Sequence, residues 1–121
     1  MEYRISYDID VYTLISAADL VITDYSNIGA EAILLDKPLL TVNFIKEKFD
    51  FEQQYYRFGA ALYFEDYGKV EDTIIELLNY GKYSEELKAG RQRMAEMYNY
   101  HNDGKAAERI VDLLLNESSL R

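Results

Sequence analysis

The sequence predicts an α/β fold, a partial doubly wound parallel sheet of three to four strands followed by a C-terminal helical segment. Strand-like runs and helical patterns alternate over the first half of the chain, as in α/β proteins. Residues 20–23 form a short apolar run rich in β-branched side chains, which is typical of a strand covered on both faces of a parallel sheet. Beyond Gly68, helical patterns follow one another with no strand between them.

The first elements are predicted from periodicity and capping. Residues 3–9 alternate between apolar or aromatic and polar side chains, which predicts a half-buried strand. Asp10 is expected to cap a short helix. The apolar face of that helix carries Val11, Leu14, Ile15 and Ala18. The strand at residues 20–23 comes next, so the predicted strand at 3–9, this helix and the strand at 20–23 follow one another in β-α-β order.

The middle of the chain contains a turn, a helix and two further strands. Residues 24–35 read as a tight turn that enters a helix, with Ser26 or Asn27 as the N-cap. Pro38 is expected to end this helix, because proline biases the preceding residue away from helical backbone. Residues 39–44 predict a strand and residues 60–64 a last one, whereas the charged and aromatic residues 45–59 fit a loop or an irregular helix.

Three helices are expected in the second half. Apolar residues at helical spacing predict one helix beyond Gly68, a second from Ser84 to about residue 98, and a third over about residues 105–116, with a turn-rich break at 99–104. Their predicted apolar contacts are Val70, Ile74, Leu77 and Leu78, then Leu87, Met94 and Met97, and finally Ala107, Ile110, Val111 and Leu114. With no internal repeat or linker, residues 1–121 are expected to form a single domain.

Composition excludes several classes of function. With 13 Lys and Arg against 22 Asp and Glu, the formal net charge is -9, so the chain has no general attraction for nucleic acid or anionic lipid. The absence of cysteine excludes thiolate chemistry, and a single histidine, His101, offers no histidine cluster for a metal. No apolar run reaches membrane-spanning length and no signal peptide is evident, so we expect a cytoplasmic protein without cofactor or metal.

The turn after residues 20–23 is the candidate binding site. Ligands of open α/β sheets bind beyond the carboxyl ends of strands, and the N–H groups of a helix N-terminus favour phosphate. Ser26 offers a hydroxyl and Asn27 an amide, Gly29 would allow a ligand or a neighbouring backbone to approach closely, and Glu31 would accept hydrogen bonds from a ribose diol. The alternative is structural: Ser26 and Asn27 as ordinary helix caps and Glu31 as a solvated surface residue.

Two motifs, about 80 residues apart in this sequence, resemble one enzyme family. The CDP-glycerol glycerophosphotransferases, which build the poly(glycerol phosphate) of teichoic acids, carry motifs similar to residues 19–27 (DLVITDYSN), Glu31 and residues 34–38 (LLDKP), and later to residues 103–110 (DGKAAERI). Asn27 replaces the usual second serine of the signature, and Glu31 replaces its aspartate. Glu31 is closer to the pattern of UDP-N-acetylglucosamine 2-epimerases and sugar transferases, so a UDP-sugar enzyme remains open as an alternative.

The resemblance implies a place for the chain in a larger enzyme. The family belongs to the GT-B class, whose members have two Rossmann-like domains, and the chain resembles the C-terminal portion of the nucleotide-binding half. Ser26 and Asn27 would then hold the donor's pyrophosphate, and Glu31 would face its ribose, while Tyr55 and Arg57 lie in a segment that approaches the donor site. The family's catalytic histidines precede the turn, and His101 matches neither. The chain alone is therefore expected to be inactive.

The expected partners follow from this resemblance. They are a nucleotide-activated donor, either CDP-glycerol or a UDP-sugar, and neither nucleic acid nor an inserted membrane segment. The larger enzyme would act as a peripheral protein at the inner face of the membrane. The strand at residues 20–23 would have an open edge, and we expect residues 3–9 to cover it or two chains to pair there as a homodimer. A non-catalytic interaction module is the alternative from a different class.

Overall fold

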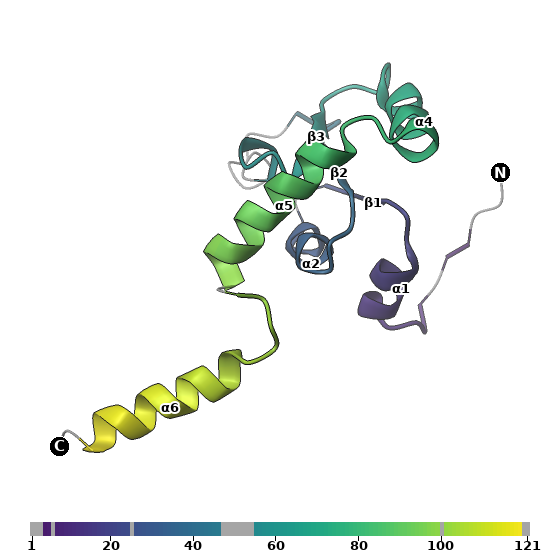
Figure 1. The fold of residues 1–121 in the computed structure, drawn as a ribbon. Coiled ribbons are helices and arrows are strands. Elements are labelled where there is room, and N and C mark those ends of the chain that lie inside the picture. Colours follow the sequence, from purple (N-terminus) through teal and green to yellow (C-terminus); the bar gives the residue numbers. More distant parts are fainter. Residues whose placement is uncertain (1–3, 6, 25, 47–54, 100, 120–121) are drawn as a thin grey trace.

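A computed structural model describes residues 4–5, 7–24, 26–46, 55–99 and 101–119. Three strands, β1 (Val21–Thr23), β2 (Leu39–Val42) and β3 (Ala61–Phe64), form a parallel sheet in the order β1-β2-β3. Val21 lies opposite Leu39, which in turn lies opposite Ala61. The expected α/β fold with a partial, Rossmann-like parallel sheet is confirmed (Figure 1).

Residues 55–57 are helical, and longer helices accompany the sheet. They are α1 (Val11–Ala17), α2 (Ile28–Leu34), α4 (Val70–Tyr80), α5 (Ser84–Asn99) and α6 (Ala106–Ser119). Helix α2 packs on β1 and β2, and α5 packs on α2 and β3. Helix α2 is the crossover between the parallel strands β1 and β2, and α5, which follows β3 and α4, packs beside it (Figure 1).

The central strand explains why the apolar runs predicted the sheet. Leu39, Leu40 and Thr41 of β2 are fully buried although successive side chains of a strand point to opposite faces. Thr41 satisfies its hydroxyl by donating to the carbonyl oxygen of Leu62, at 3.2 Å. Both faces of β2 are thus covered, which is the condition under which a strand needs no polar alternation.

The prediction of a strand at residues 3–9 is wrong for the residues of this segment that the structure describes. Residues 4–5 and 7–9 belong to no strand, and the side chain of Tyr7 is 88% exposed and that of Ile5 is 71% exposed. Alternation favours a strand only when a neighbouring strand supplies hydrogen bonds and cover, and none pairs here. Among the described residues β1 pairs with β2 alone, so residues 3–9 do not cover its other edge.

The predicted helix starts and ends fit their observed caps. Asp10 caps α1 by accepting a hydrogen bond from the Thr13 N–H, at 3.1 Å. Helix α2 ends at Leu34, and Asp36 adopts a left-handed φ of 56° just before Pro38. Leu77, Leu87 and Met94 are buried as expected, but Leu78 and Met97 are exposed rather than in the core.

Helix α6 forms where the periodicity predicts it, but its apolar face is not covered. The large apolar side chains of α6 are all more than half exposed: Ile110, Val111, Leu113, Leu114 and Leu115. Figure 1 shows α6 standing away from the sheet, beyond the connection that follows α5. The expectations for Tyr3, Tyr25 and residues 47–54 lie outside the described residues.

Candidate functional site

The turn between β1 and α2 lies at the carboxyl edge of the sheet. Ser26 is half-buried and Asn27 is exposed. Asn27 is the N-cap by position, yet its side chain makes no capping hydrogen bond. The capping oxygen comes instead from Ser26, whose Oγ accepts from the N–H of Ile28 at 3.3 Å. Of the two candidate caps, Ser26 therefore performs the capping.

The first N–H groups of α2 all have acceptors within the turn. Gly29 donates to the Ser26 carbonyl at 3.2 Å, while Ala30 and Glu31 donate to the Asn27 carbonyl at 3.0 and 3.3 Å. Most of these bonds are longer than the usual N–H···O distance of about 2.9–3.0 Å. A phosphate at this turn would have to share or replace them, so the side chains of Ser26 and Asn27 are its more accessible donors.

Gly29 is needed for packing against Tyr55. A Cβ at Gly29 would lie 2.6 Å from Cε2 of Tyr55, and both residues are buried. Close approach at Gly29 is thus made by an aromatic side chain, rather than by the ligand or backbone that the sequence suggested. Burial raises the pKa of the Tyr55 phenol, and a hydrogen bond with the Ala30 backbone opposes this. Tyr55 therefore closes over the same turn that carries Ser26.

Glu31 lies one turn into α2 and does not fit a solvated surface residue. Its side chain is half-buried, and its Oε1 accepts a hydrogen bond from the Tyr12 hydroxyl of α1 at 3.4 Å. Its Oε2 is buried, with no hydrogen-bond partner among the described residues. A buried carboxylate oxygen without a hydrogen-bond partner is energetically unfavourable, which distinguishes Glu31 from an ordinary surface glutamate.

Two further polar side chains at the carboxyl edge were not predicted. Asn43, which follows β2, is 4% exposed, and its Nδ2 donates to the Tyr63 hydroxyl at 3.1 Å. That hydroxyl donates in turn to Glu65 Oε1, also at 3.1 Å. Because the strands are parallel, their carboxyl ends and the Ser26 turn share one edge of the sheet. A polar residue directly after a strand was the signal that could have found Asn43, whereas Tyr63 lies within β3 and carries no such signal.

Comparison with protein families identifies the family of the chain. The model of the CDP-Glycerol:Poly(glycerophosphate) glycerophosphotransferases matches residues 2–116, nearly the whole chain. The chain belongs to this family. The resemblance inferred from the two sequence motifs is thereby confirmed. Comparisons with curated proteins and with solved structures found no match.

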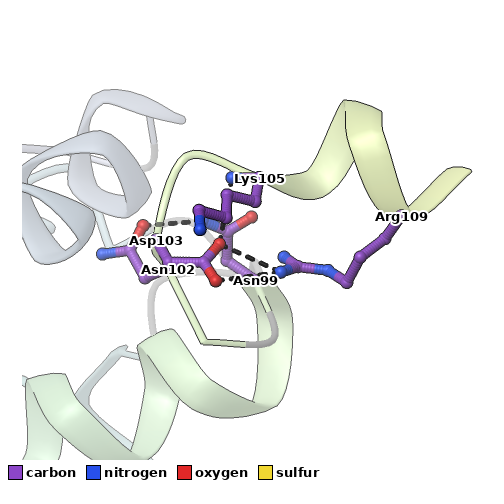
Figure 2. A network of polar contacts seen from close by, with 5 residues as sticks. All are labelled: Asn99, Asn102, Asp103, Lys105 and Arg109. Carbon is purple, nitrogen blue, oxygen red and sulfur yellow. Dashed lines mark hydrogen bonds and ion pairs between the residues drawn. The ribbon is translucent and has the colours of Figure 1, made fainter.

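The closing motif of this glycerophosphotransferase-family chain organises the start of α6. Asp103 Oδ1 accepts from the Lys105 N–H, and both of its carboxylate oxygens lie 3.0 Å from Nη1 of Arg109 (Figure 2). The Arg109 guanidinium, more than any other group, holds the pKa of Asp103 below its usual range. Asn102 donates through Nδ2 to the carbonyl of Leu34, at 2.9 Å, at the end of α2 opposite to the Ser26 turn.

The other family motif, at residues 34–38, also has a structural part. Arg91 of α5 is 6% exposed, and its Nε donates to Asp36 Oδ1 at 2.9 Å. This ion pair fastens α5 to the connection between α2 and β2. In this glycerophosphotransferase-family chain, the two motifs outside the turn therefore hold helices in place. The residues predicted to bind the donor lie in the turn, Ser26 and Asn27, and in the first turn of α2, Gly29 and Glu31.

His101 and Arg57 were also considered from the sequence, and both are exposed. His101 is exposed in the connection between α5 and α6, with a left-handed φ of 69°. Arg57 is exposed. Across the described residues, no group of three or more His, Asp or Glu side chains is placed to hold a metal ion. A search of the same residues found no helix long and apolar enough to cross a membrane.

Proposed function

We propose that this chain is the donor-nucleotide-binding part of a transferase that moves glycerol phosphate from CDP-glycerol to a cell-surface polymer of the teichoic acid type. Family membership supports the transferase class and the donor. The observation that carries the binding role is the turn after β1, where the half-buried Ser26 hydroxyl lies at the carboxyl edge of the sheet and the Glu31 carboxylate follows one helical turn later.

Each residue of the turn has a distinct part in this proposal. The Ser26 hydroxyl accepts from Ile28 and keeps its own O–H to donate to a phosphate oxygen, since a hydroxyl is both donor and acceptor. The exposed amide of Asn27 donates to the same pyrophosphate. Glu31 accepts from the ribose, and Gly29 admits the Tyr55 ring that closes the turn.

The reaction would be a phosphoryl-type transfer. A hydroxyl oxygen of the polymer forms a bond to the phosphorus of the glycerol phosphate and gives up its proton to a base that the rest of the enzyme would supply. The bond from that phosphorus to the bridging oxygen breaks, and CMP leaves with the electron pair. Charge develops on the leaving phosphate, so donors at the turn would stabilise it while they position the donor. This chain would supply those contacts without a catalytic base and be inactive alone.

The larger setting belongs to the same proposal. The chain would be one domain, the C-terminal portion of the nucleotide-binding half of a GT-B enzyme that works in the cytoplasm, peripherally at the inner face of the membrane. Two chains would pair through the edge of β1 that no described residue occupies. A monomer in sedimentation at millimolar concentration, together with full amide protection of residues 21–23, would count against this homodimer.

Two other candidates are each favoured by a specific observation. Glu31 in place of the family's usual aspartate favours a UDP-sugar-using transferase or epimerase-like enzyme. The internal acceptors of the first N–H groups of α2 favour a non-catalytic interaction module in which Ser26 is only a cap. These candidates differ in base preference and in whether any nucleotide binds.

A titration of the isotope-labelled chain with CDP, UDP and CDP-glycerol tests the proposal. Saturable amide shifts at residues 26–31 that are stronger for the cytidine ligands are expected, and stronger shifts with UDP would move the chain to the sugar-nucleotide class. No shift at millimolar ligand would favour the interaction module and contradict nucleotide binding by this chain.

Two serine variants then separate binding from capping. Ser26→Ala is expected to remove binding and to cost about 0.5–2 kcal/mol of stability as a lost cap. Ser16→Ala, an exposed serine within α1, is the matched control and should change neither quantity. If Ser26→Ala lowers stability but leaves nucleotide affinity unchanged, the serine is a cap and no donor contact.

A further inference from the structure

A hollow lies between the end of α5 and the start of α6. It measures about 400 Å³, and the side chains that line it include Met97 and Tyr98 of α5 and Ile110 and Leu113 of α6. These side chains are between 56% and 66% exposed. The ring of Tyr98 is held in place by an edge-on contact with Phe58, with ring centroids 6.0 Å apart. The apolar surface of α6 therefore continues across the hollow onto α5.

The connection between α5 and α6 holds this surface in a defined direction. Asn102 accepts from Nδ2 of Asn99, at the end of α5, at 2.7 Å, and donates to the Leu34 carbonyl of α2 at 2.9 Å. Asp103 then pairs with Arg109 near the start of α6 (Figure 2). The connection is thus bonded to α5, to α2 and to α6 itself. The exposed apolar side chains of α6 therefore sit on a helix whose start is fixed by specific contacts.

The exposed apolar surface is larger than a monomer usually leaves uncovered. We call it the α5–α6 face, and it consists of Met97, Tyr98 and residues 110, 111 and 113–115, all more than half exposed. At roughly 100 Å² of apolar surface for each side chain, the face covers on the order of 700 Å². The largest apolar patch of a typical monomer is about 300–600 Å², and one side of a stable protein interface buries about 800 Å². The area is thus sufficient for a specific protein contact.

The charged side chains around the α5–α6 face are mostly acidic. Over residues 106–119, three carboxylates stand against one guanidinium, which gives a net charge of -2. That guanidinium, of Arg109, already takes part in an ion pair. Glu108 and Glu117 are exposed, and each lies seven positions from an apolar residue of the face, which places it nearly in line with that residue along the helix. A complementary surface therefore carries lysine or arginine beside its apolar residues.

These charges determine which kind of partner fits. A second copy would bring two acidic surfaces together, each on a chain of net charge -9. An anionic membrane would also be repelled, since helices that lie on membranes carry lysine and arginine on their polar face. We propose that the α5–α6 face binds an amphipathic helix of a protein partner, whose apolar stripe fills the hollow and whose flanking side chains are lysine or arginine. This inference is independent of nucleotide binding at the Ser26 turn.

The test titrates the isotope-labelled 121-residue chain with two synthetic helical peptides. They share one leucine pattern, and one has lysine and the other glutamate at every polar position. The lysine peptide is expected to shift the amides of residues 97–99 and 106–113 and to bind about tenfold more tightly, because several exposed ion pairs add up. Equal binding of the two peptides, binding of neither, or shifts confined to other residues would overturn the proposal.

An apolar variant tests whether the hollow receives the peptide. Leu113→Gln keeps a good helix former and should weaken binding of the lysine peptide at least tenfold, because a leucine contact is lost. Leu78→Gln is the matched control, at a leucine of α4 that is 48% exposed, and should leave the affinity unchanged. Equal affinities of the two variants would show that the peptide does not bind in the hollow.

A charge reversal tests the acidic surroundings of the face. Glu108→Lys should weaken the lysine peptide about two- to fivefold and strengthen the glutamate peptide. Glu85→Lys makes the same change of net charge in the first turn of α5, away from the face, and should affect neither peptide. If both substitutions weaken the lysine peptide equally, the attraction comes from the net charge of the chain and the proposed complementarity is wrong.

Two further measurements examine the other occupants of the face. Leu113→Gln is expected to leave the sedimentation of the chain unchanged at every concentration, and neither protein should sediment with vesicles of phosphatidylcholine and phosphatidylglycerol. Self-association that Leu113→Gln removes would assign the face to a second copy. Vesicle binding that Leu113→Gln removes would assign it to lipid, and either result would overturn the proposal.

Discussion

Gly29 has no side chain, and the aromatic ring of Tyr55 fills the space beside it. The ring of Tyr55 fills the volume that a Cβ would take, and it thereby closes the turn on which Ser26 sits. No local sequence pattern connects these residues, which are 26 positions apart, so the need for glycine here was visible only once the chain was folded. The same holds for the Tyr12–Glu31 contact, which depends on how α1 and α2 pack.

Gly29→Ala tests this packing. The added methyl would lie 2.6 Å from the Tyr55 ring, and overpacking of this kind costs about 1–3 kcal/mol, more than the helix propensity that alanine gains. Urea denaturation should show the loss. In a double variant with Tyr55→Leu, the penalty of the added methyl should shrink, and strictly additive effects would contradict the contact.

The contribution of the ion pair between Arg91 and Asp36 to stability can also be tested by a single substitution. Asp36→Asn keeps a side chain that tolerates the left-handed φ of 56° but removes the charge that faces the buried guanidinium. Because Asp36 is 61% exposed, the expected loss is about 1 kcal/mol in urea denaturation. Asp66→Asn, at an exposed aspartate that accepts only a local turn bond, is the control. Equal stability of Asp36→Asn and the unaltered chain would show that the pair is not formed.

Among the elements, those with a strong local signal were predicted and those that need a distant partner were not. The β-branched run at β1 and the cap at Asp10 are local signals, and both elements form. Alternation over residues 3–9 is also local, but a strand requires a neighbour, and the described part of this segment has none. The candidate residues of the turn were also chosen from a local signal, and their role stays a prediction. Asn43 and Tyr63, which contact each other only because β2 and β3 pair, were not found from the sequence.

The connection from α5 to α6 should respond to acid. Arg109 lowers the pKa of Asp103 below its ordinary value of 3.8, so the folded state binds this proton less readily than the unfolded state. The stabilising contribution is therefore fully present above pH 3.8 and is lost as the pH falls through the lower, folded pKa. Amide shifts of residues 103–109 should report the change on acidification. Asp103→Asn should already show the altered shifts at neutral pH, and identical spectra would contradict the assigned role.

In the whole molecule, α6 forms a helix but contributes no side chain to the buried core cluster. The buried core joins the sheet to α1, α2 and α5, whereas the large apolar side chains of α6 remain exposed beyond the connection that follows α5. The amphipathic pattern of α6 predicted a packed helix, because periodicity states which face is apolar and says nothing of what covers it. Within the described chain, the sheet and its covering helices thus account for the core without α6.

Two leucine-to-alanine substitutions compare how much the core and α6 contribute to the free energy of unfolding. Leu40→Ala removes a fully buried side chain from β2 and should cost about 2–5 kcal/mol in urea denaturation. Leu115→Ala makes the same chemical change at a side chain 63% exposed on α6 and should alter the free energy of unfolding by less than about 0.5 kcal/mol. A large loss from Leu115→Ala would mean that α6 packs on an apolar surface in solution, and its dependence on protein concentration would tell a second copy from a contact within one chain.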